Sequence, residues 1–310
     1  MFFFKSIKIL RRLVIFPIKW MFSNAIWYFH YGTRILRIDK ITNKHDNSEI
    51  IYFNKFFKLH DGKNIFVCKT DFLTSDFKKI SKIQNKVILV TGNSDIPIDS
   101  NYFAKLPANV YKWYAQNSTF SNEKIIPIPL GIENFDFALR KGHGVKYSRV
   151  EEKIDLLSKQ SGITPTRFIY ANFSISTNTT YRQTVYNFVK NIPHIDLEDP
   201  DLTISEFFNK ILDYKMILCP IGNGIDTHRL WEVLYSKRVP VVIRIKECNI
   251  YDLYTKFPII ILDDIAALKN APLIEELYKL AINKYFNDDL LNYSYWEKMI
   301  ENDLKSLNYQ

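Results

Sequence analysis

The residues best suited to chemistry lie between positions 219 and 235. There a short apolar stretch leads into a loop that contains Gly222 and Gly224, and we expect a helix to begin at Thr227. Glycine lets the backbone approach a ligand closely, and the free N–H groups at a helix N-terminus carry a partial positive charge. This loop therefore predicts a site for phosphate groups.

Two charged side chains on the expected helix extend this site. Arg229 offers a fork of donors that suits a diphosphate. Glu232 lies one turn after His228 on the same helical face, and its carboxylate can accept hydrogen bonds from both hydroxyls of a ribose. The pattern predicts a nucleoside-diphosphate site formed by Gly222, Asn223, Gly224, Asp226, Thr227, His228, Arg229 and Glu232. In the alternative interpretation the loop is only a turn and Asp226 only caps the helix.

A second strand, loop and helix follow the same logic at residues 167–190. Arg182 stands near the start of its expected helix, and its charge suits a leaving diphosphate. Asn172 and Ser174, at the end of the expected strand, would add hydrogen bonds to the same ligand. We therefore predict that these three residues complete the donor site.

Residues 219–242, CPIGNGIDTHRLWEVLYSKRVPVV, resemble the donor-site motif of exostosin-like glycosyltransferases, which have the GT-B fold. Earlier pieces are also similar, namely 91–97 (TGNSDIP), 113–117 (WYAQN) and 128–134 (IPLGIEN). The resemblance spans roughly residues 85–245. It implies that the C-terminal domain binds a sugar nucleotide, that the N-terminal domain binds the acceptor, and that Glu232 contacts the donor ribose.

The resemblance also bears on stereochemistry. Many retaining GT-B enzymes carry a second Glu eight positions before the ribose-binding one, whereas position 224 is Gly here. This favours inversion, in which a base deprotonates the acceptor hydroxyl. Asp95, just after a buried strand, is the first candidate, and Glu133 is the second. The alternatives are a turn or cap role for Asp95 before Pro97 and a solvated surface position for Glu133.

Polar residues near these two carboxylates are expected to orient sugar hydroxyls, with ordinary turn roles as the alternative. They are Asn93, Ser94, Asn117 and Asn134.

The elements that must position these residues alternate along the chain. Near-continuous apolar runs at 86–92, 110–116 and 124–130 are typical of buried parallel strands, and further strands are expected at 49–54 and 64–72. A second series follows, with strands at 167–174, 215–220, 239–245 and 258–263 and a helix at 151–159. The pattern predicts an α/β, GT-B-like fold with two Rossmann-like domains facing a cleft. We expect an acceptor-binding domain at 41–150 and a nucleotide-sugar-binding domain at 151–310, the latter including the terminal helices.

Residues 1–40 differ from the rest of the chain in charge. They hold eight Lys and Arg against one Asp, which accounts for +7 of the net charge of +9. On a helix, five of these cations form one stripe opposite Phe, Ile, Leu and Trp side chains. This predicts a basic amphipathic segment that associates with an anionic membrane surface, or alternatively a helix packed on the first domain. Its uncharged runs are too short to span a bilayer.

Composition excludes several classes of protein. The chain of 310 residues is 47% hydrophobic, so it is not wholly disordered, and three Cys are too few for a disulfide framework. A nucleic-acid partner is not expected, because the basic charge is confined to residues 1–40. Asp199 and Asp201 match a D-x-D metal motif, but a capping box at Thr203 and Glu206 follows directly, so we interpret them as a helix start. We expect no metal and no cofactor beyond the donor.

The sequence therefore predicts a metal-independent, inverting glycosyltransferase with a glycan or glycolipid acceptor. Its Lys-, Asn- and Ile-rich composition and the resemblance suggest bacterial surface polysaccharide synthesis at the inner face of the membrane, in the cytoplasm. Two alternatives remain open. A NAD-dependent oxidoreductase would need a third glycine at position 227, which is Thr. A non-catalytic, membrane-attached sugar- or nucleotide-binding protein would bind the donor without transfer.

Overall fold

The computed structural model describes residues 48–133, 150–160, 162–245 and 248–308. The predicted amphipathic segment and Asn134 lie outside these residues. Within them, no helix is long and apolar enough to cross a membrane.

The first sheet has four parallel strands in chain order. They are β1 (Ile65–Lys69), β2 (Val87–Gly92), β3 (Val110–Ala115) and β4 (Ile125–Pro127). Helices α3 (Leu73–Ile80) and α4 (Ser100–Phe103) connect them. Every residue of β2 is buried, as expected for an apolar run in a parallel sheet.

The second sheet has five parallel strands in the order β6-β5-β7-β8-β9. The strands are β5 (Arg167–Ala171), β6 (Ile195–Leu197), β7 (Tyr214–Leu218), β8 (Val239–Ile243) and β9 (Ile260–Leu262). The helices are α6 (Thr179–Val189), α7 (Ile204–Ile211), α8 (His228–Tyr235), α9 (Ile250–Tyr254) and α10 (Ala271–Asn283). The chain reverses its direction across the sheet between β5 and β7, and such a switch point leaves a crevice at the strand ends.

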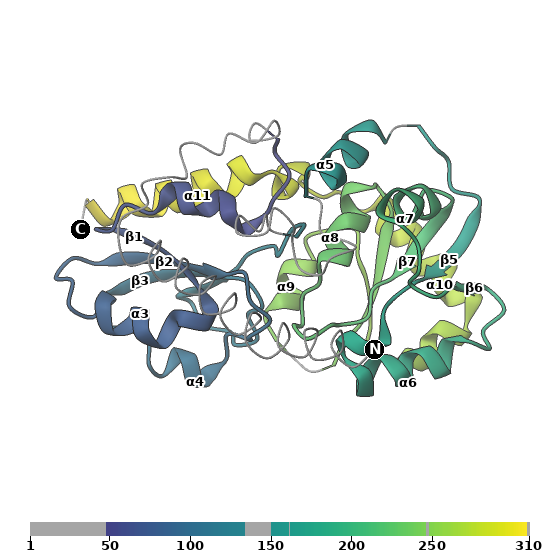
Figure 1. Ribbon diagram of the computed structural model, residues 1–310, viewed down its shortest axis with the longest axis horizontal. Coiled ribbons are helices and arrows are strands. Elements are labelled where there is room, and N and C mark those ends of the chain that lie inside the picture. The colour runs from purple at the N-terminus through teal and green to yellow at the C-terminus, as the bar shows by residue number, and fades with distance from the viewer. Residues whose placement is uncertain (1–47, 134–149, 161, 246–247, 309–310) are drawn as a thin grey trace, which may run out of the picture.

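These two sheets confirm the predicted α/β class with two Rossmann-like domains. They lie at opposite ends of the molecule (Figure 1). The helix predicted at 151–159 is α5 (Val150–Lys159), between the two sheets in the chain. The capping box predicted at Thr203 and Glu206 is present at the start of α7.

Two predictions about the elements are wrong. A strand was expected at 49–54, but Phe53–Leu59 forms a 3-10 helix, η3, and only Ile50 makes a single bridge. Phe53, Phe56 and Phe57 are spaced to bury one face of this turn, and that burial outweighs their strand propensity.

The other correction concerns the last helix, α11 (Tyr293–Asn308), which was expected to belong to the C-terminal domain. It returns to the first sheet, where Trp296 and Ile300 join the core of η3 and the Tyr114 hydroxyl donates to Asp303 at 2.6 Å. Figure 1 shows α11 lying along β1 and β2. By contrast, α10 stays with the second sheet, against β8 and β9.

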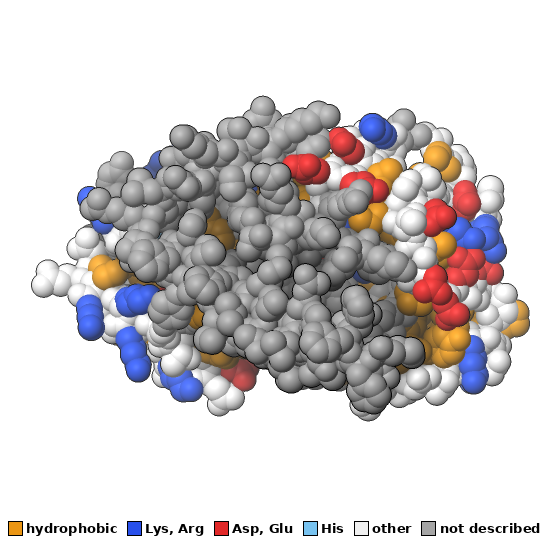
Figure 2. Space-filling view, in the orientation of Figure 1, with side chains coloured by type: hydrophobic (Ala, Val, Ile, Leu, Met, Phe, Trp, Pro, Cys, Tyr) orange, Lys and Arg blue, Asp and Glu red, His pale blue; other side chains and the backbone are white. Residues whose placement is uncertain are grey.

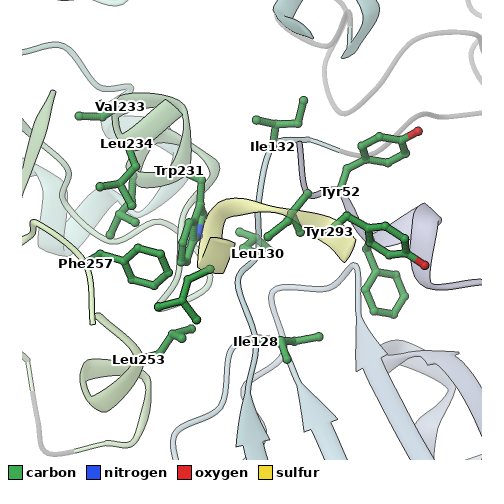
Figure 3. Close-up of a cluster of buried hydrophobic side chains, with 14 of the residues drawn as sticks. Tyr52, Ile128, Leu130, Ile132, Trp231, Val233, Leu234, Leu253, Phe257 and Tyr293 are labelled. Carbon is green, nitrogen blue, oxygen red and sulfur yellow. The ribbon is translucent and has the colours of Figure 1, made fainter. Parts of the chain in front are cut away.

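One continuous apolar cluster joins the two domains. Ile128, Leu130 and Ile132 from the first domain belong to the same cluster as Trp231 and Phe257 from the second (Figure 3). Trp231 packs edge-on against Phe257 with ring centroids 5.2 Å apart. The domains therefore share a core, which fixes their relative position.

Side-chain charge is not even over the face seen in Figure 2. Lys and Arg gather at the end formed by the first domain, whereas Asp and Glu gather over the second domain. The described parts of the two domains therefore differ in surface charge on this face.

Candidate active site

A cavity of about 650 Å³ lies between the domains, at the carboxyl ends of both sheets. The loops after β1 and β2 form one wall, and the loops after β5 and β7 form the other. The second wall is the switch point of its sheet, where doubly wound folds bind ligands. The volume suits a ligand of nucleotide size.

The N-terminus of α8 opens into this cavity. Thr227 is the N-cap, and its side chain makes no capping hydrogen bond. His228 and Arg229 follow as the first helical residues and also line the cavity. The start of an eight-residue helix and a guanidinium thus face the same space, which suits an anionic ligand.

Arg229 is held on three sides. Its guanidinium lies 3.7 Å from the ring centre of Phe207, and its Nη1 donates to the carbonyl of Asn172 at 2.8 Å. Its Nε lies 3.5 Å from Glu232 Oε2 and has no hydrogen-bond partner among the described residues. The side chain is preorganised, and because Nε is buried, only the terminal nitrogens of the guanidinium can meet a ligand in the cavity.

Glu232 belongs to a buried cluster of charges. Its Oε1 lies 2.7 Å from the ammonium of Lys153, which also lies 3.1 Å from Glu133 Oε2. Burial by itself would raise the pKa of Glu232, but the charges of Lys153 and Arg229 outweigh it and hold the pKa below its ordinary value. Burial would lower the pKa of Lys153, yet Glu232 and Glu133 raise it. Glu232 and Lys153 are therefore both ionised at neutral pH.

Lys153 was missed in the sequence analysis, although a signal was present. The buried positions of α5 are Val150, Lys153, Ile154 and Leu157, which follow the spacing of an apolar helix face. A lysine within such a face needs a buried partner. That rule would have selected Lys153 but could not have named Glu133 and Glu232.

Asp226 was predicted to contact the sugar-nucleotide donor, but its carboxylate is already bonded within the protein. Its carboxylate is 3% exposed and accepts from the Leu130 amide, the Thr227 amide, Trp231 Nε1 and the Tyr254 hydroxyl. Burial raises its pKa to about 6, and these hydrogen bonds only partly offset that rise. Because four donors already use its oxygens, Asp226 joins the domains rather than offering an acceptor to a ligand.

Asn117 departs from its prediction for the same reason. Its Oδ1 accepts from the amide of Asp226 at 2.9 Å, and its Nδ2 donates to the carbonyl of Ser94 at 2.7 Å. It is 1% exposed and does not line the cavity. Gly224 is required by this contact, since a Cβ there would lie 2.8 Å from Asn117 Oδ1. This glycine allows the domains, rather than a ligand, to approach.

Arg182 lines the cavity, but its guanidinium donates hydrogen bonds to backbone carbonyls. Its Nε, Nη1 and Nη2 donate to the carbonyls of Ile221, Ser174 and Pro220. Burial, followed by the nearby charge of Arg229, lowers the pKa of Arg182 to about 10. Arg182 therefore fixes the loop after β7 against the loop after β5, and its charge adds to the field of the cavity.

Asn172 and Ser174, also predicted to bind the sugar-nucleotide donor, already make hydrogen bonds within the protein. Asn172 donates through Nδ2 to the carbonyl of Asp199 at 2.9 Å, so its backbone carbonyl, bonded to Arg229, is its contribution to the site. The Ser174 hydroxyl lies 2.8 Å from that of Ser176. His228 places Nδ1 2.9 Å from the carbonyl of Gly131, which orients its ring.

The two candidate bases occupy different surroundings. Asp95 is exposed at the edge of the cavity, and its Oδ2 accepts from Asn223 Nδ2 at 3.3 Å, across the cleft. Glu133 is 5% exposed and paired with Lys153. Asn93 and Ser94 line the same wall as Asp95.

Lys69 and Asp71, which also line the first wall, were not predicted. They form an ion pair of 3.3 Å just after β1. The strand expected at 64–72 ran past them, whereas β1 ends at Lys69. With that boundary, the reasoning that selected Asp95 after β2 would also have selected Asp71.

In the described part of the chain, no three His, Cys, Asp or Glu side chains form a group that could hold a metal ion. The expectation of metal independence stays a prediction.

Comparison with known proteins adds little detail. No family model matches the chain, and no curated protein matches it. The exostosin-like resemblance therefore stays a prediction.

Several solved structures are similar, and two are described here. One is an α1,3-fucosyltransferase solved with GDP-fucose, with 12% identity, a TM-score of 0.37, and coverage of 71% of this chain and 77% of that one. The other is the pneumococcal O-GlcNAc transferase GtfA with UDP and GlcNAc, with 13% identity, a TM-score of 0.35, and coverage of 81% and 59%. Proteins at these scores need not share an activity, so we rest the proposal below on the site itself.

Proposed function

We propose that this protein transfers a sugar from a nucleoside-diphosphate donor to a hydroxyl of a glycan or glycolipid. The observation that carries the proposal is the placement of Arg229 and the start of α8 at the switch point of the second sheet. The exposed Asp95 lies on the opposite wall. A cationic wall and a carboxylate wall meet over one cavity, which is the charge pattern that this transfer needs.

In the proposed reaction the donor diphosphate lies at the N-terminus of α8 and against Arg229. The acceptor hydroxyl lies near Asp95. Asp95 takes the hydroxyl proton while the oxygen attacks the anomeric carbon, and the bond from that carbon to the diphosphate oxygen breaks. The negative charge that grows on the leaving diphosphate is stabilised by Arg229, so that no metal is needed for this step.

Asp95 is preferred to Glu133 because of their surroundings. A buried carboxylate beside a lysine is stabilised as an anion and is a weak base. Asp95 is in contact with solvent, and among the described residues its hydrogen-bond partner is Asn223. We therefore give inversion, with Asp95 as base, as the mechanism.

A panel of nucleoside diphosphates and sugar nucleotides in a thermal-shift assay tests the donor site. A ligand present at 100 times its dissociation constant should add about 2.7 kcal/mol of stability. Transfer to glycan acceptors, with the anomeric configuration of the product determined, then separates an enzyme from a binding protein. Retention of configuration would contradict the role of Asp95.

The charge of residues 1–40 supports a membrane-surface location at the inner face, with a role in surface polysaccharide synthesis. In this proposal the full-length protein binds anionic vesicles at low salt, and deletion of residues 1–22 abolishes that binding while leaving activity on a soluble acceptor. Equal vesicle binding by both forms would contradict it.

A further inference from the structure

Lys153 forms part of the cavity wall but has no part in the reaction proposed above. Its side chain is 8% exposed and comes from α5, an element outside both sheets. It lies 2.7 Å from Glu232 Oε1 and 3.1 Å from Glu133 Oε2. Burying three charges in one contact costs desolvation free energy that their mutual attraction need not recover. The cluster therefore calls for an explanation other than stability.

Glu232 has two cations within reach, and they compete for it. Lys153 holds one oxygen at 2.7 Å, whereas Arg229 Nε lies 3.5 Å from the other. An arginine and a carboxylate ordinarily pair through two parallel hydrogen bonds. Here that pairing is absent, since Arg229 Nε makes no hydrogen bond among the described residues and Nη1 turns to the carbonyl of Asn172.

We propose that Lys153 is a positioning residue: it holds Glu232 away from Arg229 and so keeps the guanidinium available for a diphosphate. Glu133 fixes the other side of the ammonium and thereby its place between the two carboxylates. The role of Lys153 rests on the proposed function, because it needs an anionic ligand at Arg229. Without Lys153, Glu232 turns to Arg229 as its remaining cation. A bidentate pair would use the buried Nε together with a terminal nitrogen, and that terminal nitrogen is a donor that the ligand needs.

The test measures the binding of inorganic pyrophosphate, UDP and GDP by calorimetry, with uridine and guanosine as uncharged references. Lys153→Met keeps the length of the side chain and removes its charge. We expect the affinity for pyrophosphate to fall at least about tenfold, which corresponds to one charge-assisted hydrogen bond. Binding of uridine and guanosine, which carry no phosphate for Arg229, should fall by less than binding of pyrophosphate, because only the contact predicted between Glu232 and the ribose would be lost. Lys159→Met, at an exposed position of the same helix, is the matched control and should bind all ligands as the unchanged protein does.

A second variant separates positioning from a structural role. In Lys153→Met combined with Glu232→Gln, the neutral amide no longer competes for Arg229, so pyrophosphate affinity should recover. An undiminished affinity in Lys153→Met, or an equal loss in both variants, would overturn the proposal. If Lys153→Met alone does not fold, the double variant is compared with Glu232→Gln. Equal pyrophosphate affinities are then expected, and weaker binding by the double variant overturns the proposal.

The unchanged protein distinguishes this inference from the proposed function. If it binds none of pyrophosphate, UDP and GDP, then the proposed function fails, and the role of Lys153 fails with it. If it binds them and Lys153→Met does so equally well, only the role of Lys153 fails.

Discussion

The two walls of the cleft hold their charged side chains differently. On the second-domain wall, Arg182 and Arg229 are held by backbone carbonyls, and Arg229 also lies on the ring of Phe207. On the first-domain wall, Asp71 and Asp95 are exposed to solvent. Fixed cations need no rearrangement when negative charge develops beside them, which is how a protein stabilises a leaving group. Exposed carboxylates can meet acceptors of different shape and release a proton to water. In the proposed reaction the second-domain wall therefore binds the charged donor, and the first-domain wall accepts the proton.

The largest expected effect is on the first-domain wall. Asp95→Asn keeps the shape of the side chain but cannot take a proton, so turnover should fall about 10²–10⁴-fold with little change in donor affinity or melting temperature. Initial rates at saturating donor measure this. Glu123→Gln, at an exposed position of the same domain, is the control. Turnover that survives Asp95→Asn but falls in Asp71→Asn would move the base to Asp71.

On the second-domain wall, Arg229→Ala should lower turnover about 10²–10³-fold, since it removes a fixed donor from the growing diphosphate charge. Steady-state kinetics with a sugar nucleotide measure the change. Arg167→Ala, which removes a half-exposed ion pair on β5 away from the cavity, should leave turnover unchanged. An unaffected Arg229→Ala would show that the fixed wall is not the diphosphate site.

The stability of the folded protein should depend on pH through Asp226, which lies where the two domains meet. Its pKa is about 6 in the folded protein and near 3.8 when unfolded, so the folded state binds the proton more tightly. Its contribution to stability is therefore full below pH 3.8 and is lost as the pH rises through 6, by up to about 3 kcal/mol. Denaturant unfolding at pH 4 and pH 7 measures it. The stability of the unchanged protein relative to Asp226→Asn should be greater at pH 4, and a pH-independent difference would contradict the assignment.

The smallest expected effect concerns the close approach of the domains. Gly224→Ala places a Cβ 2.8 Å from Asn117 Oδ1 and should cost about 1–3 kcal/mol of stability. Gly222→Ala is the matched control, because its Cβ would meet Thr177 Cγ2 at 3.3 Å, where a small shift suffices. Thermal unfolding compares the two. Equal losses would mean that the contact between Asn117 and the loop after β7 does not limit the approach of the domains.

Residues whose role depends on local spacing could be predicted from the sequence. The apolar runs identified β2, β3 and β7, and the capping box identified the start of α7. The glycine loop and Arg229 were placed correctly at a helix start, because a strand, a loop and a helix follow one another within a few residues.

What the sequence determined by itself is thus the α/β alternation, the loop before α8 and the charge of residues 1–40. Only the tertiary structure decided which polar side chains already have hydrogen-bond partners within the protein and so are not available to a ligand. Asp226 and Asn117 are bonded across the domain boundary, 96 and 109 residues from their partners, and α11 returns to the first sheet. Such contacts join residues that are distant in the chain, and no local period encodes which buried lysine meets which carboxylate. The role of Lys153 therefore became visible only when α5, α8 and the end of the first domain were brought together.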